Sequence, residues 1–126
     1  MKRVISTDAA PAAVGAYSQA TTNGDVLFTA GQLPLTPDGE LLDDESVATQ
    51  TEQCLENVAA ILESEGLTLG DVLKVTIFLD DIDDFDEMNE TYGSFFDEEP
   101  PARSAVEVGN VPKGAALEIE AIAAAE

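Results

Sequence analysis

The sequence predicts an α+β domain in which one mostly antiparallel mixed sheet carries two helices on a single face. Two observations support this fold class. Segments 46–65 and 83–96 space their apolar residues at a helical period, whereas several shorter runs alternate or are continuously apolar, as strands are. Their order along the chain is three strands, a helix, a strand, a helix and two strands. A length of 126 residues is typical of a single domain, so we assign residues 1–126 to one.

The first three predicted strands are short. Lys2–Ser6 forms the first, and Tyr17–Thr21 and Val26–Ala30 form a hairpin around the Asn-Gly-Asp turn at residues 23–25. A polar connection over residues 31–44 then leads to the first helix.

Ser46 is a predicted cap for a helix that runs to Glu65 and ends at Gly66. Its apolar stripe consists of Val47, Cys54, Leu55, Val58, Ile61 and Leu62. Because Cys54 belongs to this stripe, we interpret it as a core residue and not as a nucleophile.

Val72–Leu79 is a nearly continuous apolar run, which favours a buried central strand. Asp83 or Asp84 is then expected to cap a second helix, beside whose apolar stripe lies Asn89. That stripe, which we assign to the core, contains Phe85, Met88, Tyr92, Phe95 and Phe96. The acidic run 80–90 could suggest calcium, but it lacks the glycine of an EF-hand loop, and a solvated helix start is the preferred interpretation.

The segment Pro100–Ala121 predicts two strands joined by a turn rich in Gly, Asn and Pro. If residues 108 and 115 pair across that turn, Ala105 falls opposite Glu118 and Arg103 becomes its diagonal neighbour. A guanidinium can bind a substrate carboxylate in two-point fashion, and a neighbouring carboxylate can accept a proton from water. The alternative is a structural cross-strand ion pair, and a one-residue slip would move Glu118 to the other face.

The composition is strongly acidic, with 26 acidic residues, five basic residues and a net charge of −21. Such a chain repels nucleic acid and anionic membranes. It indicates a cytosol of very high salt, as in salt-accumulating halophiles, although an ordinary acidic protein is the alternative. Arg3 and Arg103 are the only arginines, so an arginine within an apolar strand is expected to have a specific role.

Histidine is absent, which excludes His-based triads and His-ligated metal sites. The single cysteine cannot form an internal disulfide, which favours a reducing cytoplasm. We expect neither a signal peptide nor a membrane span. Because two helices cover only one sheet face, the other would remain as an apolar patch, and self-association is the expected remedy.

Five segments resemble the RidA/YjgF family of enamine/imine deaminases. They are APAAVGAYSQA (10–20), LFTAGQLP (27–34), QCLENVAAILESEG (53–66), MNETYGSFF (88–96) and PPARSAVEV with LEIEAIA (100–123). The resemblance implies a chorismate-mutase-like fold, a homotrimer and ligand clefts between subunits. It also implies hydrolysis of 2-iminopropanoate and 2-iminobutanoate to 2-oxoacids and ammonia, without a metal or cofactor.

The resemblance also implies roles for individual residues. Arg103 matches the arginine that grips the substrate carboxylate, and Glu118 matches the glutamate that positions the attacking water. Tyr17, Gly31 and Asn89 match residues that line the pocket.

Three departures concern the pocket. Many members have cysteine where this chain has Ala105, whose backbone N–H could still meet the carboxylate, and serine where it has Ala30. The 97–100 loop is shorter than in some members. The alternatives are a non-catalytic member that binds small carboxylates or proteins, and a chaperone-like protein.

Overall fold

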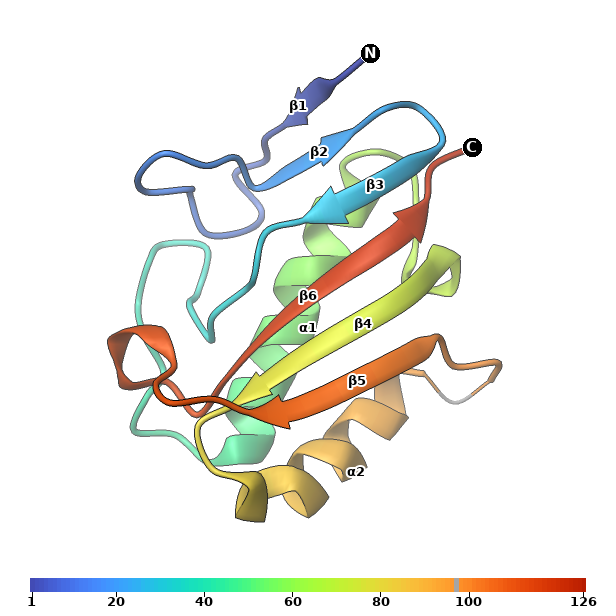
Figure 1. Ribbon diagram of the computed structural model, residues 1–126. Helices are drawn as coiled ribbons and strands as arrows, with labels where there is room; N and C mark the ends of the chain where they lie inside the picture. Colours follow the sequence, from blue (N-terminus) through green and yellow to red (C-terminus); the bar gives the residue numbers. More distant parts are fainter. Residues whose placement is uncertain (97) are drawn as a thin grey trace.

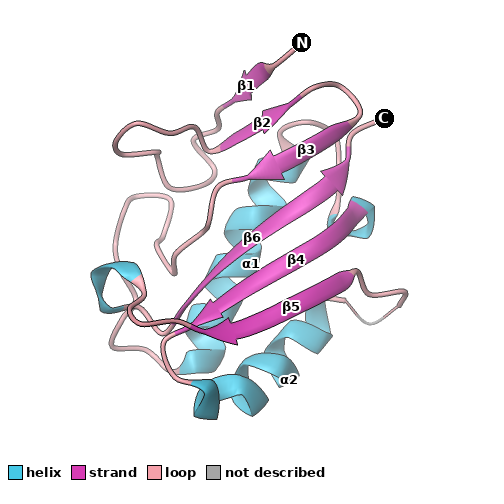
Figure 2. Ribbon diagram, in the orientation of Figure 1, coloured by secondary structure: helices cyan, strands magenta, loops and turns pink. Residues whose placement is uncertain are grey.

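Six strands form one sheet in the order β1-β2-β3-β6-β4-β5, and two helices cover one of its faces (Figures 1 and 2). The computed structural model describes residues 1–96 and 98–126. The strands are β1 (Arg3–Ile5), β2 (Ala20–Thr22), β3 (Val26–Thr29), β4 (Val72–Leu79), β5 (Ala102–Glu107) and β6 (Leu117–Ala124), and the helices are α1 (Val47–Glu63) and α2 (Phe85–Phe95). Neighbouring strands are antiparallel except β4 and β5, which are parallel. The predicted fold class is therefore confirmed.

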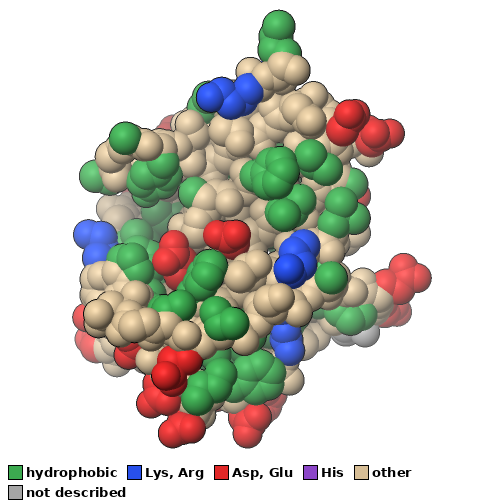
Figure 3. All heavy atoms as spheres, in the orientation of Figure 1, with side chains coloured by type: hydrophobic (Ala, Val, Ile, Leu, Met, Phe, Trp, Pro, Cys, Tyr) green, Lys and Arg blue, Asp and Glu red, His purple; other side chains and the backbone are tan. Residues whose placement is uncertain are grey.

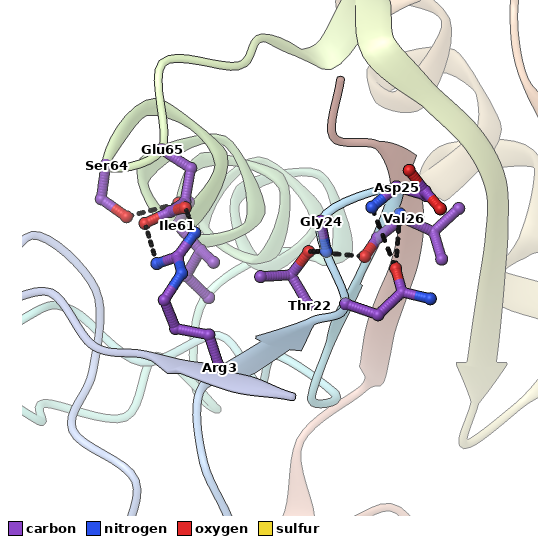
Figure 4. A network of polar contacts seen from close by, with 9 residues as sticks. Arg3, Thr22, Gly24, Asp25, Val26, Ile61, Ser64 and Glu65 are labelled. Carbon is purple, nitrogen blue, oxygen red and sulfur yellow. Dashed lines mark hydrogen bonds and ion pairs between the residues drawn. The ribbon is translucent and has the colours of Figure 1, made fainter. Parts of the chain in front are cut away.

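The N-terminal hairpin forms at the predicted turn, although β2 begins at Ala20, three residues later than expected. The Asn23 side chain accepts hydrogen bonds from the backbone N–H groups of Asp25 and Val26, and Gly24 has a φ of +97°. Figure 4 shows this turn near a second contact, in which the Arg3 guanidinium donates to both oxygens of Glu65. That ion pair ties β1 to the end of α1.

Local signals define both helix starts. The Ser46 hydroxyl accepts from the Thr49 N–H at 3.1 Å, so the predicted cap of α1 is confirmed. Asp84 occupies the N-cap position of α2, as predicted, although its side chain makes no capping hydrogen bond. A 3₁₀ turn over Ile82–Asp84 precedes the helix, and the Asp81 side chain caps this turn by accepting from the Asp83 N–H.

The core lies between the sheet and the helices. Its fully buried side chains include Leu55, Val58, Ile61 and Leu62 of α1, Met88 of α2, Val75, Ile77 and Leu79 of β4, and Leu117 and Ile119 of β6. Cys54 is among the buried residues, which confirms its assignment to the core. Both helical stripes thus pack on the same side of the sheet.

The predicted hairpin between β5 and β6 is wrong, because β4 lies between these two strands. The connection from β5 to β6 folds around the end of β4, where Val108 N–H donates to Leu79 O and Asp80 N–H donates to Ala116 O. A strand as apolar as β4 gains most free energy when it is buried between two neighbouring strands. This gain outweighs the free energy of a local hairpin between β5 and β6, which the turn residues favour.

The second face of the sheet carries neither helix. Figure 3 looks onto this open face, where hydrophobic side chains gather over β3 and beside it. Phe28 and Val106 are 48% and 45% exposed there. None of the helices within residues 1–96 and 98–126 is long and apolar enough to cross a membrane.

Candidate functional site

Arg103 lies on β5 and packs against α2. Its guanidinium donates to the Asn89 side-chain oxygen at 2.7 Å, and its central carbon lies 4.7 Å from the Tyr92 ring centre and 5.4 Å from that of Phe85. Residues 85, 89 and 92 follow the i, i+4, i+7 spacing of one helix face, so α2 presents all three to the arginine. One amide and two rings thereby hold the guanidinium in one orientation.

A cavity of about 400 Å³ opens beside this guanidinium. It is lined by Asn89, Tyr92, Gly93, Phe96, Pro100, Pro101 and Arg103. Burial raises the pKa of Tyr92, although the positive charge of Arg103 acts to lower it. The cavity therefore combines a cation with largely apolar walls, an arrangement that suits a small organic anion.

Glu118 lies in a second cavity of about 410 Å³. This cavity is lined by Tyr17, Ala30, Gly31, Leu33, Pro112, Lys113 and Glu118. Glu118 belongs to β6, between the core residues Leu117 and Ile119, so its side chain points to the open face of the sheet.

The backbone of residues 29–32 brings Gly31 against Glu118. β3 separates from β6 after Phe28, and the Thr29 hydroxyl then accepts from the Ala121 N–H at 3.0 Å. Pairing resumes at Gln32, which exchanges two backbone hydrogen bonds with Ile119. Gly31 lies inside this irregular stretch, and a Cβ at that position would overlap the Glu118 carboxylate. A side chain at position 31 would therefore displace the Glu118 carboxylate from the place that it occupies.

The surroundings of Glu118 favour its protonated form. Burial raises the pKa of its carboxyl group, and the negative charge of Glu120 raises it further. A carboxyl group whose pKa is raised towards neutrality is suited to accept and return a proton.

The expectation that Arg103 and Glu118 are cross-strand neighbours is wrong. Arg103 pairs with Val75 of β4, whereas Glu118 pairs with Phe78 on the other side of β4. Residues 75 and 78 are an odd number of positions apart, so the two side chains point to opposite faces. The alternative of a structural ion pair between them is wrong for the same reason.

The predicted site residues therefore form two groups in one chain. Asn89 and Arg103 share the first cavity, whereas Tyr17, Gly31 and Glu118 share the second. Ala105 lies two residues beyond Arg103 on the same side of β5 and lines neither cavity.

Sequence reasoning missed several lining residues. Lys113 stands in the connection between β5 and β6 with a φ of +64°, and nothing in the sequence marks it as part of a site. Phe85 and Tyr92 are predicted only as core residues, yet both rings pack on the Arg103 guanidinium, and Tyr92 also lines the first cavity. Their spacing from Asn89 is the signal that indicates a shared helix face. Of the short 97–100 loop, Pro100 lines the first cavity, and residue 97 lies outside the described residues.

The described parts of the chain contain no group of three or more His, Cys, Asp or Glu side chains that could hold a metal ion. In the acidic run before and within α2, most carboxylates are exposed. This agrees with the interpretation of that run as a solvated helix start.

Comparisons with known proteins agree on one family. The model of the family described as Endoribonuclease L-PSP matches residues 7–125. A RutC family protein of Pyrococcus horikoshii is 52% identical, and the 2-iminobutanoate/2-iminopropanoate deaminase of Escherichia coli is 47% identical, each over 98% of both chains. The crystal structure of E. coli TdcF with bound serine has a TM-score of 0.93 and 43% identity, covering 98% of this chain and 99% of that one.

Proposed function

Because the chain belongs to the RidA/YjgF family, we propose that it hydrolyses reactive 2-imino and enamino acids to 2-oxoacids and ammonia. 2-Iminopropanoate and 2-iminobutanoate are the proposed substrates. The relative named for this activity is 47% identical over 98% of both chains, and the TdcF structure holds serine, which has an α-carboxylate and an α-nitrogen like the proposed substrates.

The observation that carries this proposal is that Arg103 forms no ion pair with any carboxylate in residues 1–96 and 98–126. The chain has 26 acidic residues, yet among the residues that the structure describes no carboxylate lies within ion-pairing distance of this arginine. Asn89 uses one edge of the guanidinium, and a cavity opens beside it. A guanidinium fork that no protein carboxylate occupies is suited to bind the carboxylate of a substrate in two-point fashion.

We infer that the complete site forms between subunits of a homotrimer. Arg103 and Glu118 of one chain point to opposite faces of the sheet, so one chain does not bring both to one small substrate. The exposed apolar side chains of the open face favour burial against another copy. Such packing would join the Arg103 cavity of one subunit to the Glu118 cavity of its neighbour.

The proposed reaction needs few groups. Arg103 holds the carboxylate of the protonated imine, whose C2 is already electrophilic. Glu118 accepts a proton as water oxygen bonds to C2, and the proton then passes to the nitrogen. The C–N bond of this tetrahedral intermediate breaks and ammonia leaves, the C2 hydroxyl gives its proton to the Glu118 carboxylate, and C2 becomes the carbonyl carbon of the 2-oxoacid; the ammonia takes that proton and departs as ammonium. No redox change occurs, and we propose that neither metal nor cofactor takes part.

We propose that this chain does not have the endoribonuclease activity that the description of the family names. A net charge of −21 repels a phosphate backbone, and the chain has five basic residues in all. We therefore propose small-molecule substrates and no nucleic-acid or membrane partner. A cytoplasmic location stays a prediction.

The test of this function follows imine decay with purified protein in molar KCl. The two imines are generated in situ, and their loss is compared with the uncatalysed rate. Wild type should accelerate the decay, and Glu118→Gln should lower the catalysed rate by about 10²–10⁴-fold, because Gln accepts no proton. Binding of 2-oxobutanoate should change little in this variant, because Arg103 remains.

Glu120→Gln is the matched control, since Glu120 lies two residues along β6 on the same face. It should retain most of its activity at neutral pH. If wild-type protein binds 2-oxobutanoate but does not accelerate imine decay, the chain is a carboxylate-binding member of the family and not a deaminase.

A further inference from the structure

Two of the chain segments that line the Glu118 cavity form hydrogen bonds with side chains of α1. One is the 29–35 segment that contains Gly31, and the other is the start of β6 that contains Glu118. The 29–35 segment separates from β6 after Phe28 and meets it again at the bridge between Gln32 and Ile119, whereas β6 pairs with β4 from Leu117 onward. Buried polar side chains of α1 add a contact to each segment.

Gln50 supports the start of β6. Its side chain is buried, and its Oε1 accepts a hydrogen bond from the Ala116 N–H at 2.9 Å, two residues before Glu118. Its Nε2 donates to the backbone oxygen of Glu45 at 2.9 Å and to that of Asp43 at 3.4 Å. One amide therefore joins the chain before α1 to the backbone that leads into Glu118.

Asn57 supports the other segment, two turns along the same helix. Its Nδ2 donates to Leu33 O at 3.2 Å and to Leu35 O at 2.8 Å, and its Oδ1 accepts from the Gln53 side chain at 2.9 Å. Asn57 is 1% exposed. A buried amide with three partners fixes the position of the segment that it binds.

We propose that Gln50 and Asn57 are positioning residues that hold the Glu118 carboxylate in its reactive place over Gly31. Neither residue lines the cavity, and each acts through the backbone that it binds. The inference rests on the proposed deaminase function for its kinetic test, but its spectroscopic test does not depend on turnover.

Gln50→Met and Gln50→Glu separate positioning from stability. Met has a similar length and forms no hydrogen bond to Ala116, whereas a carboxyl oxygen in Q50E still accepts that N–H. Q50E should be the less stable of the two, because it buries a group that is readily charged beside two backbone oxygens. If Gln50 positions Glu118, Q50E should nevertheless be the more active in the folded fraction.

The expected result is a fall in kcat of about 10- to 100-fold for Q50M, since small displacements of a catalytic group cost this much. KM should stay unchanged, because the Arg103 cavity is untouched. Ile61→Val removes a buried methylene from the same helix and should lower the melting temperature without changing kcat. If Q50M does not fold, Asn57→Leu is measured instead, with the same expectation.

The second readout is the pH titration of the Glu118 carboxyl carbon by ¹³C NMR, with its signal assigned by its loss in E118Q. In Q50M the pKa of Glu118 should move back towards that of an exposed glutamate. If wild type lacks turnover, the proposed function fails and this titration alone decides the positioning role. Either of two results would overturn the inference. One is that the pKa of Glu118 in Q50M equals that of wild type. The other is that kcat follows stability, so that Q50E is both less stable and less active than Q50M.

Discussion

The Glu118 carboxylate occupies the space that a side chain at position 31 would need. Gly31→Ala should therefore push the carboxylate away from its cavity or distort the 29–32 segment. Because a misplaced catalytic group costs about 10²-fold in rate, we expect a large fall in kcat with the fold retained. Imine-decay kinetics and circular dichroism would measure the two effects.

Gly109→Ala is the control for this change, because a Cβ at Gly109 meets nothing within 4 Å. It should leave kcat unaltered. Equal activity of Gly31→Ala and wild type would show that the contact between Gly31 and Glu118 has no bearing on the reaction.

Arg103→Lys keeps the positive charge but removes the planar fork and its stacking on Tyr92. Losing a charge-assisted hydrogen bond costs about 1.5–3 kcal/mol, so affinity for 2-oxobutanoate should fall about tenfold or more. Calorimetric titration would measure this change.

Arg3→Lys is the matched control for that measurement, since Arg3 forms an exposed ion pair with Glu65, away from both cavities. Its effect on binding should be negligible. A variant Arg103→Lys that unfolds, yet binds normally in its folded fraction, would mean that the arginine is structural.

The pH dependence of the catalysed rate should report the raised pKa of Glu118. The ionised form accepts the proton, so activity should fall as the pH drops through this pKa. Glu120 contributes to the rise, so Glu120→Gln should shift the acid limb of the profile to lower pH. If the acid limb of the pH–rate profile lies at the same pH in wild type and in Glu120→Gln, the group that titrates is not Glu118.

The same pKa has a consequence for stability. The pKa of Glu118 is higher in the folded chain than in the unfolded chain. At pH values between these two pKa values the folded chain binds more protons, so the free energy of unfolding decreases as the pH rises through this range. Glu118→Gln removes this contribution. The variant should therefore lose less stability than wild type as the pH rises from acidic to neutral values, as thermal melts at several pH values would show.

We expect the chain to form a trimer, because one sheet face exposes apolar side chains and because Arg103 and Glu118 lie in separate cavities of one chain. Light scattering in molar KCl should give about three times the chain mass of 13.2 kDa. Replacing the exposed Phe28 with Lys should weaken the assembly and lower the activity together, because the site would no longer be complete. A monomer with full activity would contradict the proposed site between subunits.

Salt should stabilise the protein. A net charge of −21 per chain repels itself, and dissolved ions screen that repulsion within a Debye length of about 10 Å at 0.1 M salt and about 3 Å at 1 M. The melting temperature should climb as KCl rises from dilute to molar. If it stays level over that range, adaptation to a salt-rich cytosol is wrong.

The element order, the apolar stripes of both helices and the Ser46 cap could all be predicted from the sequence. These features depend on local periodicity and on side-chain chemistry, which neighbouring residues carry. The sequence could not place Arg103 relative to Glu118, since turn residues between their strands favoured a hairpin. Only the tertiary structure decided that β4 takes the place between them, because strand order depends on burial summed over the whole sheet. The same long-range packing brought Gly31 under Glu118 and joined Gln50 to Ala116, contacts that no local pattern encodes.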